Sequence, residues 1–164
     1  MAANPGTQIA YIGLGSNLGD RQWALQEALN RLRGSPGIQV RAVSPMIQTQ
    51  PAGGPPGQPT YLNAAAELEV TLTPRELLGR LMEIEQALGR RREQEERWGP
   101  RVCDLDILLI DNLIIDTPEL VIPHPRMHRR RFVLEPLAAI APLARHPVRG
   151  KTVAQMLADL ENAP

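Results

Sequence analysis

The sequence DLDILLI at residues 104–110 begins with two aspartates and ends in an apolar run, which is typical of a buried β-strand. Side chains alternate between the two faces of a strand, so Asp104 and Asp106 should point one way. The core should then receive Cys103, Leu105 and Ile107. Two neighbouring carboxylates raise each other's pKa unless a cation lies between them, and arginine or Mg²⁺ could serve. Two aspartates that simply solvate a strand end are an equal alternative at this point.

Composition limits the classes of protein that this strand could belong to. The 164 residues fit one domain, 1–164, in which we expect residues 1–8 to be frayed. A formal net charge of zero gives no general attraction to nucleic acid or membranes. Lys151 is the only lysine among 18 basic residues, and arginine suits phosphate, although genomic base composition is the simpler explanation. A single cysteine and the lack of a long apolar run predict a cytoplasmic protein without disulfides.

The remaining periodicity predicts an α+β fold. Strands are expected at 9–12, 37–44, 61–70 and 104–110, and helices from about 21 to Gly34 and from the Thr73 capping box to Gly89. Beyond these we expect short extended pieces at 113–115 and 120–122, a helix broken or started at Pro136, and a C-terminal helix over 152–160. The order β-α-β-β-α-β is the ferredoxin-like plan, an antiparallel sheet with helices on one face and added C-terminal strand and helix elements.

A glycine-rich segment, GLGSNLGD at residues 13–20, follows the first predicted strand. Its glycine spacing is not that of a dinucleotide fingerprint, and it does not lead into the Gly-Lys-Ser/Thr of a P-loop. We interpret it as a tight turn. Either its backbone approaches a ligand or a neighbouring strand, or the turn is purely structural.

Two loops and one strand contain candidate binding residues. The proline- and glycine-rich segment 50–59 is better explained as a long ordered loop beside a site than as a domain linker. The charged segment 90–97 is normally a solvated stretch, but here it could fold over the carboxylates. Tyr61 and Asn63 share one strand face and could stack on a flat heterocycle and bond its edge, although an exposed pair is the simpler explanation. His124 and His128 are four apart, but Pro125 argues against a zinc site.

Together these features favour phosphate chemistry. The two carboxylates could hold a divalent metal, the metal could hold phosphates, and the arginine-rich loops around residues 90–97 and 126–131 could neutralise developing charge. Positioning and electrostatics dominate such transfer reactions, so the site needs no covalent nucleophile.

Five strings resemble one known family. They are YIGLGSNLG at 11–19, QPTYLNAA at 58–65, RWGPR at 97–101 followed by DLDIL at 104–108, IPHPRM at 122–127, and RFVL at 131–134. In this order they closely resemble the hydroxymethyl-dihydropterin pyrophosphokinases of folate biosynthesis, and the resemblance covers essentially the whole chain. It implies transfer of the β,γ-diphosphoryl group of ATP to the hydroxymethyl oxygen of the pterin, leaving AMP.

The resemblance also implies residue roles. Asp104 and Asp106 would bridge two Mg²⁺ ions, and Arg90 and Arg101 would stabilise the transferred group. The implied nucleotide-binding residues are Arg92, Arg97, Trp98, Ile107, His124 and Arg130. Those implied for the pterin are Thr49 through its backbone, Tyr61 and Phe132 as the aromatic sandwich, and Asn63 at the ring edge. Partners would then be small molecules rather than nucleic acid or membrane, and the protein would be a monomer.

Some matches leave alternatives open. Segments 92–97 and 51–58 are slightly longer than the family pattern, and a neighbouring arginine could take the role of Arg130.

Two other functions fit the same predicted fold. One is a nucleic-acid binder whose arginine loops contact phosphates, although it lacks the aromatic ladder of an RNA-reading sheet. The other is a regulatory module that binds a nucleotide or pterin without turnover.

Overall fold

A computed structural model of the chain describes residues 6–50, 54–90 and 101–163. Its elements in chain order are β1 (Gln8–Ser16), α1 (Arg21–Arg33), β2 (Ile38–Val43), β3 (Ile47–Thr49), β4 (Tyr61–Val70), α2 (Pro74–Ala87), β5 (Asp104–Ile110), β6 (Ile115–Asp116), β7 (Val121–Ile122), the 3₁₀ turn η2 (Met127–Arg129), α3 (Arg131–Ile140) and α4 (Val153–Glu161).

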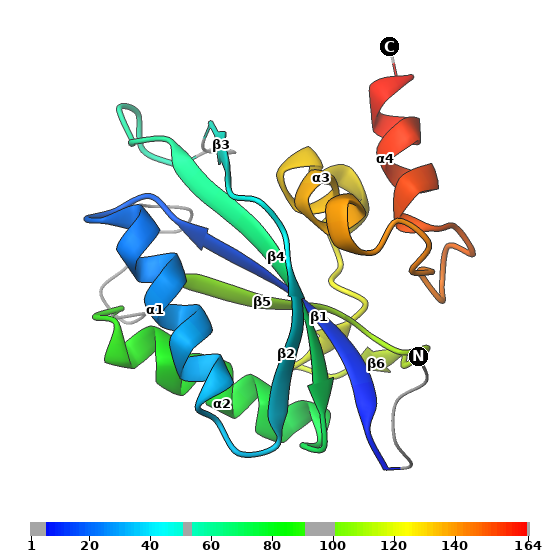
Figure 1. Ribbon diagram of the computed structural model, residues 1–164. Helices are drawn as coiled ribbons and strands as arrows, with labels where there is room; N and C mark the ends of the chain where they lie inside the picture. The colour runs from blue at the N-terminus through cyan, green and yellow to red at the C-terminus, as the bar shows by residue number, and fades with distance from the viewer. Residues whose placement is uncertain (1–5, 51–53, 91–100, 164) are drawn as a thin grey trace.

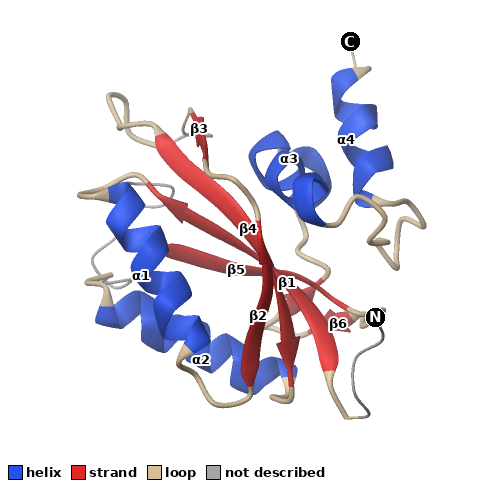
Figure 2. Ribbon diagram, in the orientation of Figure 1, coloured by secondary structure: helices blue, strands red, loops and turns tan. Residues whose placement is uncertain are grey.

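The main sheet is antiparallel and has the strand order β2-β4-β1-β5 (Figures 1 and 2). β3 pairs with the first residues of β4 and β2 with its last residues, so both lie along the same edge of β4. Helices α1 and α2 cover one face of the sheet, and α3 lies over the opposite face with α4 beside it (Figure 1). β6 and β7 form a separate small ribbon.

Two hydrophobic clusters fill the spaces between these layers. The larger lies between the sheet and α1 and α2, and it contains Cys103, Leu105 and Ile107 as expected for the inward face of β5. The smaller includes Leu108 and Leu109 and packs against α3 and α4. Both of these leucines reach the α3 side because the register of β5 against β1 shifts at this point. The layer formed by α3 and α4 was expected only as an addition to the fold, not as a second core.

The glycine-rich segment differs from the prediction. Gly13, Gly15 and Ser16 belong to β1 itself, whose pairing with β4 continues to Ser16, so the predicted turn begins only after them. A Cβ atom at Gly15 would lie 3.1 Å from Asn63 Nδ2 and 3.5 Å from the Tyr61 ring. The close approach to a neighbouring strand, one of the two alternatives, is therefore the reason for glycine at this position.

Most other elements agree with the predictions, and four details do not. α1 ends at Gly34, α2 begins at the Thr73 capping box, and β4 has the predicted bounds. Three expectations were wrong in detail: Gln8 is paired in β1 rather than frayed, α3 runs through Pro136 instead of breaking there, and β6 begins at Ile115. β3 was not predicted, because three residues are too few for a periodic signal.

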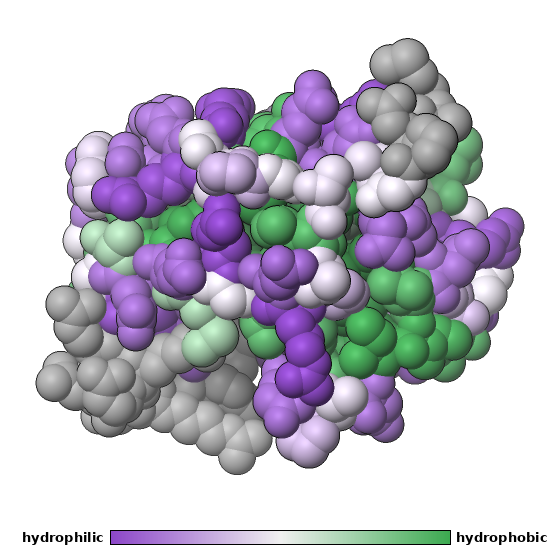
Figure 3. Space-filling model, turned by 90° about the horizontal axis from the view of Figure 1, so that it is seen from below, coloured by the Kyte–Doolittle hydropathy of each residue, from purple (hydrophilic) through white to green (hydrophobic). Residues whose placement is uncertain are grey.

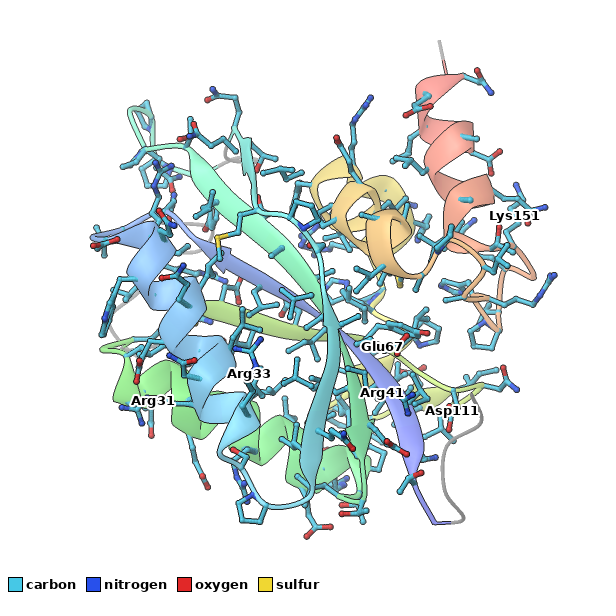
Figure 4. The ribbon with its side chains drawn as sticks, in the orientation of Figure 1. Arg31, Arg33, Arg41, Glu67, Asp111 and Lys151 are labelled. Carbon is cyan, nitrogen blue, oxygen red and sulfur yellow. The ribbon has the colours of Figure 1, made fainter. Side chains whose placement is uncertain are left out.

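The surface combines hydrophilic and hydrophobic areas. Figure 3 shows mostly hydrophilic residues on the face seen from below, with a hydrophobic area toward the right. The far part of β4 carries cross-strand ion pairs, in which Arg41 lies 3.1 Å from Glu69 and 3.8 Å from Glu67 (Figure 4). Among the described helices, none is both long and apolar enough to cross a membrane.

Candidate active site

An open pocket of about 410 Å³ lies between one end of the sheet and the start of α3. Its walls come from β1, β4, β5 and the residues around the start of α3. They are Gly13, Leu14, Gly15, Tyr61, Asn63, Ala64, Asp104, Asp106, Leu108, Arg130, Phe132 and Val133. Six of the residues predicted from the sequence are thus brought together here, although they are as much as 71 positions apart, from Tyr61 to Phe132.

One wall of the pocket is aromatic and uncharged. Tyr61 and Asn63 point to the pocket from the start of β4, because alternate residues of this strand face the two sides of the sheet. The Thr49 hydroxyl of β3 donates a hydrogen bond to Asn63 Oδ1. That bond fixes the orientation of the amide and directs Nδ2 toward other acceptors. This side-chain contact of Thr49 was not predicted, and its backbone contact with the pterin stays a prediction.

The aromatic partner on the opposite side is Phe132, at the start of α3. The guanidinium carbon of Arg130 lies 5.4 Å from the centroid of its ring, which is within the range of a cation–π contact. Phe132 and Arg130 both line the pocket across from Tyr61 and Asn63. A flat ring that entered between Tyr61 and Phe132 would have an aromatic side chain available to each of its two faces.

The other wall carries the two carboxylates. Asp104 Oδ1 lies 3.0 Å from Arg90 Nη1, and Asp104 Oδ2 lies 3.4 Å from Arg101 Nη1. Burial, reinforced by the charges of Asp104 and Glu85, raises the pKa of Asp106 to about 7. Arginine thus balances one carboxylate, whereas the other holds its proton up to neutral pH.

Glu85, a residue that the sequence analysis missed, holds Arg90 in place. Glu85 is 1% exposed, and its Oε2 accepts hydrogen bonds from Arg90 Nη1 at 2.7 Å and from the backbone N–H of Leu105 at 2.8 Å. The same arginine nitrogen also donates to the Cys103 carbonyl at 3.3 Å. A sequence signal existed: Glu85 follows Leu81 by one helical turn, so it is a carboxylate on the apolar face of α2.

His124 is held neutral beside the pocket. Burial, together with the positive charge of Arg130, lowers its pKa to about 4. Its Nδ1 accepts a hydrogen bond from the Arg126 N–H at 3.2 Å, which places the ring proton on Nε2. His124 can therefore donate one hydrogen bond to an acceptor such as a nucleotide oxygen.

Some predicted residues are not brought to the pocket. The Ile107 side chain is buried in the core on the other face of β5, so only its backbone remains for a nucleotide contact. Arg92, Arg97 and Trp98 lie outside the described residues. A Gly-Lys-Thr triplet does occur at residues 150–152, but Arg145 stands where a P-loop needs its first glycine. Thr152 instead caps α4, and Lys151 pairs with Asp159 at 2.6 Å.

Asp104 and Asp106 suit Mg²⁺ in kind and in number. They lie two positions apart on one face of β5 and both line the pocket, and among the described residues no arginine is bonded to Asp106 in place of a metal. Mg²⁺ is commonly held by one or two carboxylates, with substrate phosphates and water completing its shell. Within the described ranges there is no group of three or more His, Cys, Asp or Glu residues that could hold a metal by itself. The donor set therefore fits a metal that arrives with phosphate.

Fold and pocket together define the class, a small α+β protein whose site suits a phosphate-bearing ligand and a flat ring. The sequence model of the family described as 7,8-dihydro-6-hydroxymethylpterin-pyrophosphokinase matches residues 11–142. The chain belongs to this family.

Individual relatives agree with this assignment. The 2-amino-4-hydroxy-6-hydroxymethyldihydropteridine pyrophosphokinase of Bacillus subtilis is 48% identical over 132 residues, 80% of this chain and 77% of the relative. The enzyme of the same name from Methylorubrum extorquens is 45% identical over 152 residues, 93% of each chain. The fold is similar to that of the Plasmodium falciparum HPPK-DHPS crystallised with pteroate, with a TM-score of 0.73 at 15% identity. That match covers 97% of this chain but 43% of the Plasmodium chain, and it shows the fold alone.

Proposed function

We propose that this protein transfers the β,γ-diphosphoryl group of ATP to the hydroxymethyl oxygen of 6-hydroxymethyl-7,8-dihydropterin in folate biosynthesis. The products are the pterin diphosphate and AMP. One observation carries the proposal: a single pocket contains the carboxylates Asp104 and Asp106 and the ring-binding residues Tyr61, Asn63 and Phe132. Membership of the family supports the same reaction.

The uncharged wall binds and orients the pterin. Tyr61 and Phe132 provide the two aromatic surfaces, and Asn63 donates from Nδ2 to an acceptor at the edge of the ring. A pterin held in this way presents its hydroxymethyl group toward the carboxylates, because Asp104 and Asp106 lie in the same pocket. Holding the two reacting groups together lowers the entropic part of the barrier.

The charged wall binds the nucleotide phosphates. As the pterin oxygen bonds to the β-phosphorus, the bond from that phosphorus to the α,β-bridging oxygen breaks, AMP leaves, and the hydroxyl proton is released. Arg90 and Arg101 stabilise the charge on the transferred group, and His124 donates from Nε2 to the nucleotide. We assign further nucleotide contacts to Arg130, to the backbone of Ile107, and to Arg92, Arg97 and Trp98.

We propose that Asp104 and Asp106 hold two Mg²⁺ ions together with the phosphates. Bound Mg²⁺ would neutralise the phosphate oxygens and polarise the group that is transferred. The burial of Asp106 supports this assignment, because a carboxyl group whose pKa is raised to about 7 by burial becomes ionised when a cation enters.

Three broader assignments belong to the same proposal. The strand order β2-β4-β1-β5, with helices after β1 and β4, supports the ferredoxin-like plan in a single domain over residues 1–164. We expect a monomer that works on small molecules in the cytoplasm, where ATP is available. Nucleic acid is a poor fit because α3 covers the sheet face that RNA-binding proteins with this strand order leave open.

The test is a product assay with ATP, Mg²⁺ and hydroxymethyl-dihydropterin. We expect AMP and pterin diphosphate in equal amounts, and no AMP when the pterin or the Mg²⁺ is left out. Formation of ADP would show ordinary kinase chemistry, and binding of both substrates without any product would favour the regulatory module. Either result would overturn the proposal.

A further inference from the structure

The segment that follows β1 contains a buried asparagine with no role in the proposed reaction. Asn17 is 0% exposed, although it lies in a loop between β1 and α1. It belongs to the Gly-Ser-Asn part of the glycine-rich segment, whose function the sequence did not reveal. A fully buried side-chain amide must have partners for its polar atoms, so its contacts indicate what it does.

The two ends of the Asn17 side chain bond to two different loops. Oδ1 accepts a hydrogen bond from the backbone N–H of Arg101 at 2.8 Å, and the Asn17 N–H donates to the Arg101 carbonyl at 3.0 Å. Nδ2 donates to Gln58 Oε1 at 3.1 Å and to the Pro59 carbonyl at 3.3 Å. The opposite orientation of the amide would set oxygen against two oxygens, so these partners determine which end is which.

Each of these loops leads directly into one wall of the pocket. Pro59 precedes Tyr61 by two residues, and Tyr61 begins the uncharged wall. Arg101 precedes Asp104 by three residues, and its guanidinium lies 3.4 Å from the Asp104 carboxylate. One carboxamide therefore bridges the segment that positions the pterin and the segment that positions the phosphates.

A second contact from the same side strengthens the bridge at the Tyr61 end. Arg21, the first residue of α1, donates from Nη1 to the Thr60 carbonyl at 2.8 Å and to the Thr60 hydroxyl at 2.7 Å. Residues 58–60 are thus held against the β1–α1 segment by two side chains. The Asn17 side chain also extends this connection to Arg101.

We propose that Asn17 is a positioning residue that couples the two walls, so that occupation of the nucleotide side favours the geometry that binds the pterin, and the reverse. The proposal rests on the proposed function for the identity of the two ligands. Its physical basis is that a shift of Arg101 toward the phosphates moves the Asn17 amide, and with it Gln58 and Pro59. Thermodynamic coupling is reciprocal, so it can be measured from either side.

The experiment compares the Kd of the pterin with and without saturating Mg²⁺ and α,β-methylene-ATP. This analogue cannot be cleaved at the bond that the reaction breaks. For the wild-type protein, we expect the Kd of the pterin to be lower when the analogue is bound. The ratio of the two Kd values is the coupling factor. In Asn17→Ala that factor should fall close to one, while the affinity for the analogue alone changes less. Asn17→Asp keeps an acceptor for the Arg101 N–H but loses the donor to Pro59, so its factor should fall too.

Val70→Ala is the matched control for a loss of stability alone. Val70 is 1% exposed and lies at the far end of β4, so this variant loses core packing without touching either loop. It should keep the wild-type factor. If Asn17→Ala does not fold, Gln58→Ala removes one acceptor of the bridge and should give an intermediate factor. A wild-type factor of one, or Asn17 variants that keep the wild-type factor, would overturn the inference.

Hydrogen exchange in the absence of ligands separates this inference from the proposed function. Asn17→Ala should speed exchange in both segments 58–62 and 101–104, whereas Val70→Ala should not affect these two segments selectively. Protection that is lost in only one segment would mean that Asn17 is not a bridge. This result holds whether or not the wild-type protein forms AMP, and a protein that fails the AMP assay can still pass this test.

Discussion

The two walls of the pocket are built in different ways. The uncharged wall consists of Thr49, Tyr61 and Asn63 on paired strands, and its side chains are set by the register of β3 and β4. The charged wall contains Asp104, which forms ion pairs with Arg90 and Arg101 of the protein itself. Strand pairing fixes the side chains of the uncharged wall before a ligand binds. In the charged wall, the charged side chains are already paired with one another.

This difference implies different events on binding. A pterin can bond to Asn63 Nδ2 without breaking the Thr49–Asn63 hydrogen bond, because Nδ2 is directed away from Thr49. The proposed Mg²⁺ and the nucleotide phosphates would instead compete with Arg90 and Arg101 for Asp104. We infer that Arg90 and Arg101 balance the charge of Asp104 in the free protein and turn toward the phosphates when the ligands bind. Four predictions test this contrast.

The largest effect should come from Asp106→Asn, on the charged wall. Loss of one metal ligand should lower kcat by roughly 10³-fold or more, because stabilisation of the transferred group is lost. Asp111→Asn, at the other end of β5, is the matched control and should stay near the wild-type rate, since asparagine keeps the acceptor for the Ile9 N–H.

The same variant, Asp106→Asn, should lose less stability than the wild type at high pH, although it loses activity. The pKa of Asp106 is raised from its usual value to about 7, so the folded protein holds a proton that the unfolded chain releases above about pH 4. The wild type therefore loses stability as the pH rises from 4 to 8, and Asp106→Asn should not lose this part. Melting temperatures at pH 5 and 8 check it. An equal pH dependence in the two proteins would show that Asp106 is not held protonated.

The next largest effect should be the loss of fold stability in Arg90→Ala. It leaves the buried Glu85 carboxylate without its cation, which should cost about 3–5 kcal/mol of unfolding free energy. Arg41→Ala removes the more exposed ion pairs on β4 and should cost at most about 1 kcal/mol. Urea unfolding measures both.

A second substitution separates the two roles of Arg90. Glu85→Gln should recover part of the stability of Arg90→Ala, because the buried charge is gone and the amide oxygen still accepts from the Leu105 N–H. It should not recover activity, because the guanidinium is still missing. Recovery of both would mean that Arg90 acts on the fold alone.

On the uncharged wall, Asn63→Ala should raise the KM for the pterin by roughly 5- to 100-fold, the value of one to two hydrogen bonds made in a partly buried site. The KM for ATP should stay within about twofold, since Asn63 makes no contact with the charged wall in the described structure. Gln48→Ala, the exposed neighbour of Thr49 on β3, serves as the control. A rise in both KM values would erase the distinction between the two walls.

Strand alternation predicted the part of each wall that lies on a single strand, although the residues alone favoured an exposed pair at Tyr61 and Asn63. Tyr61 and Asn63 share a face because strands alternate, and this periodicity is visible in the letters 61–70. The same rule placed Asp104 and Asp106 together and sent Cys103 to the core, where burial raises the pKa of its thiol to about 12.

Contacts between distant segments leave no periodic signal in the sequence, so these contacts could not be predicted. Glu85 is recognisable only as an acidic residue on an apolar helix face, and its bond to the Leu105 N–H depends on how α2 packs on β5. Asn17 looked like part of a turn because its partners lie 41 and 84 positions away. The sequence left the role of Gly15 open between two alternatives for the same reason: that role depends on which strands become neighbours.

The smallest effect should come from His124, which tests how far the positive charge of the charged wall extends. Its pKa is lowered from the usual 6.5 to about 4, so below pH 6.5 the unfolded chain takes up a proton that the folded protein refuses. Stability is therefore lost as the pH falls from 6.5 to 4, by about 1–2 kcal/mol at pH 5. His124→Gln cannot titrate, so the difference in unfolding free energy between the two proteins should shift by that amount between pH 7 and pH 5. Because Arg130 contributes to the lowered pKa, the shift should be smaller when Arg130→Gln is the background for both. A difference independent of pH would show that the imidazole is not held neutral, and His124 would then lose its assignment as a donor to the nucleotide.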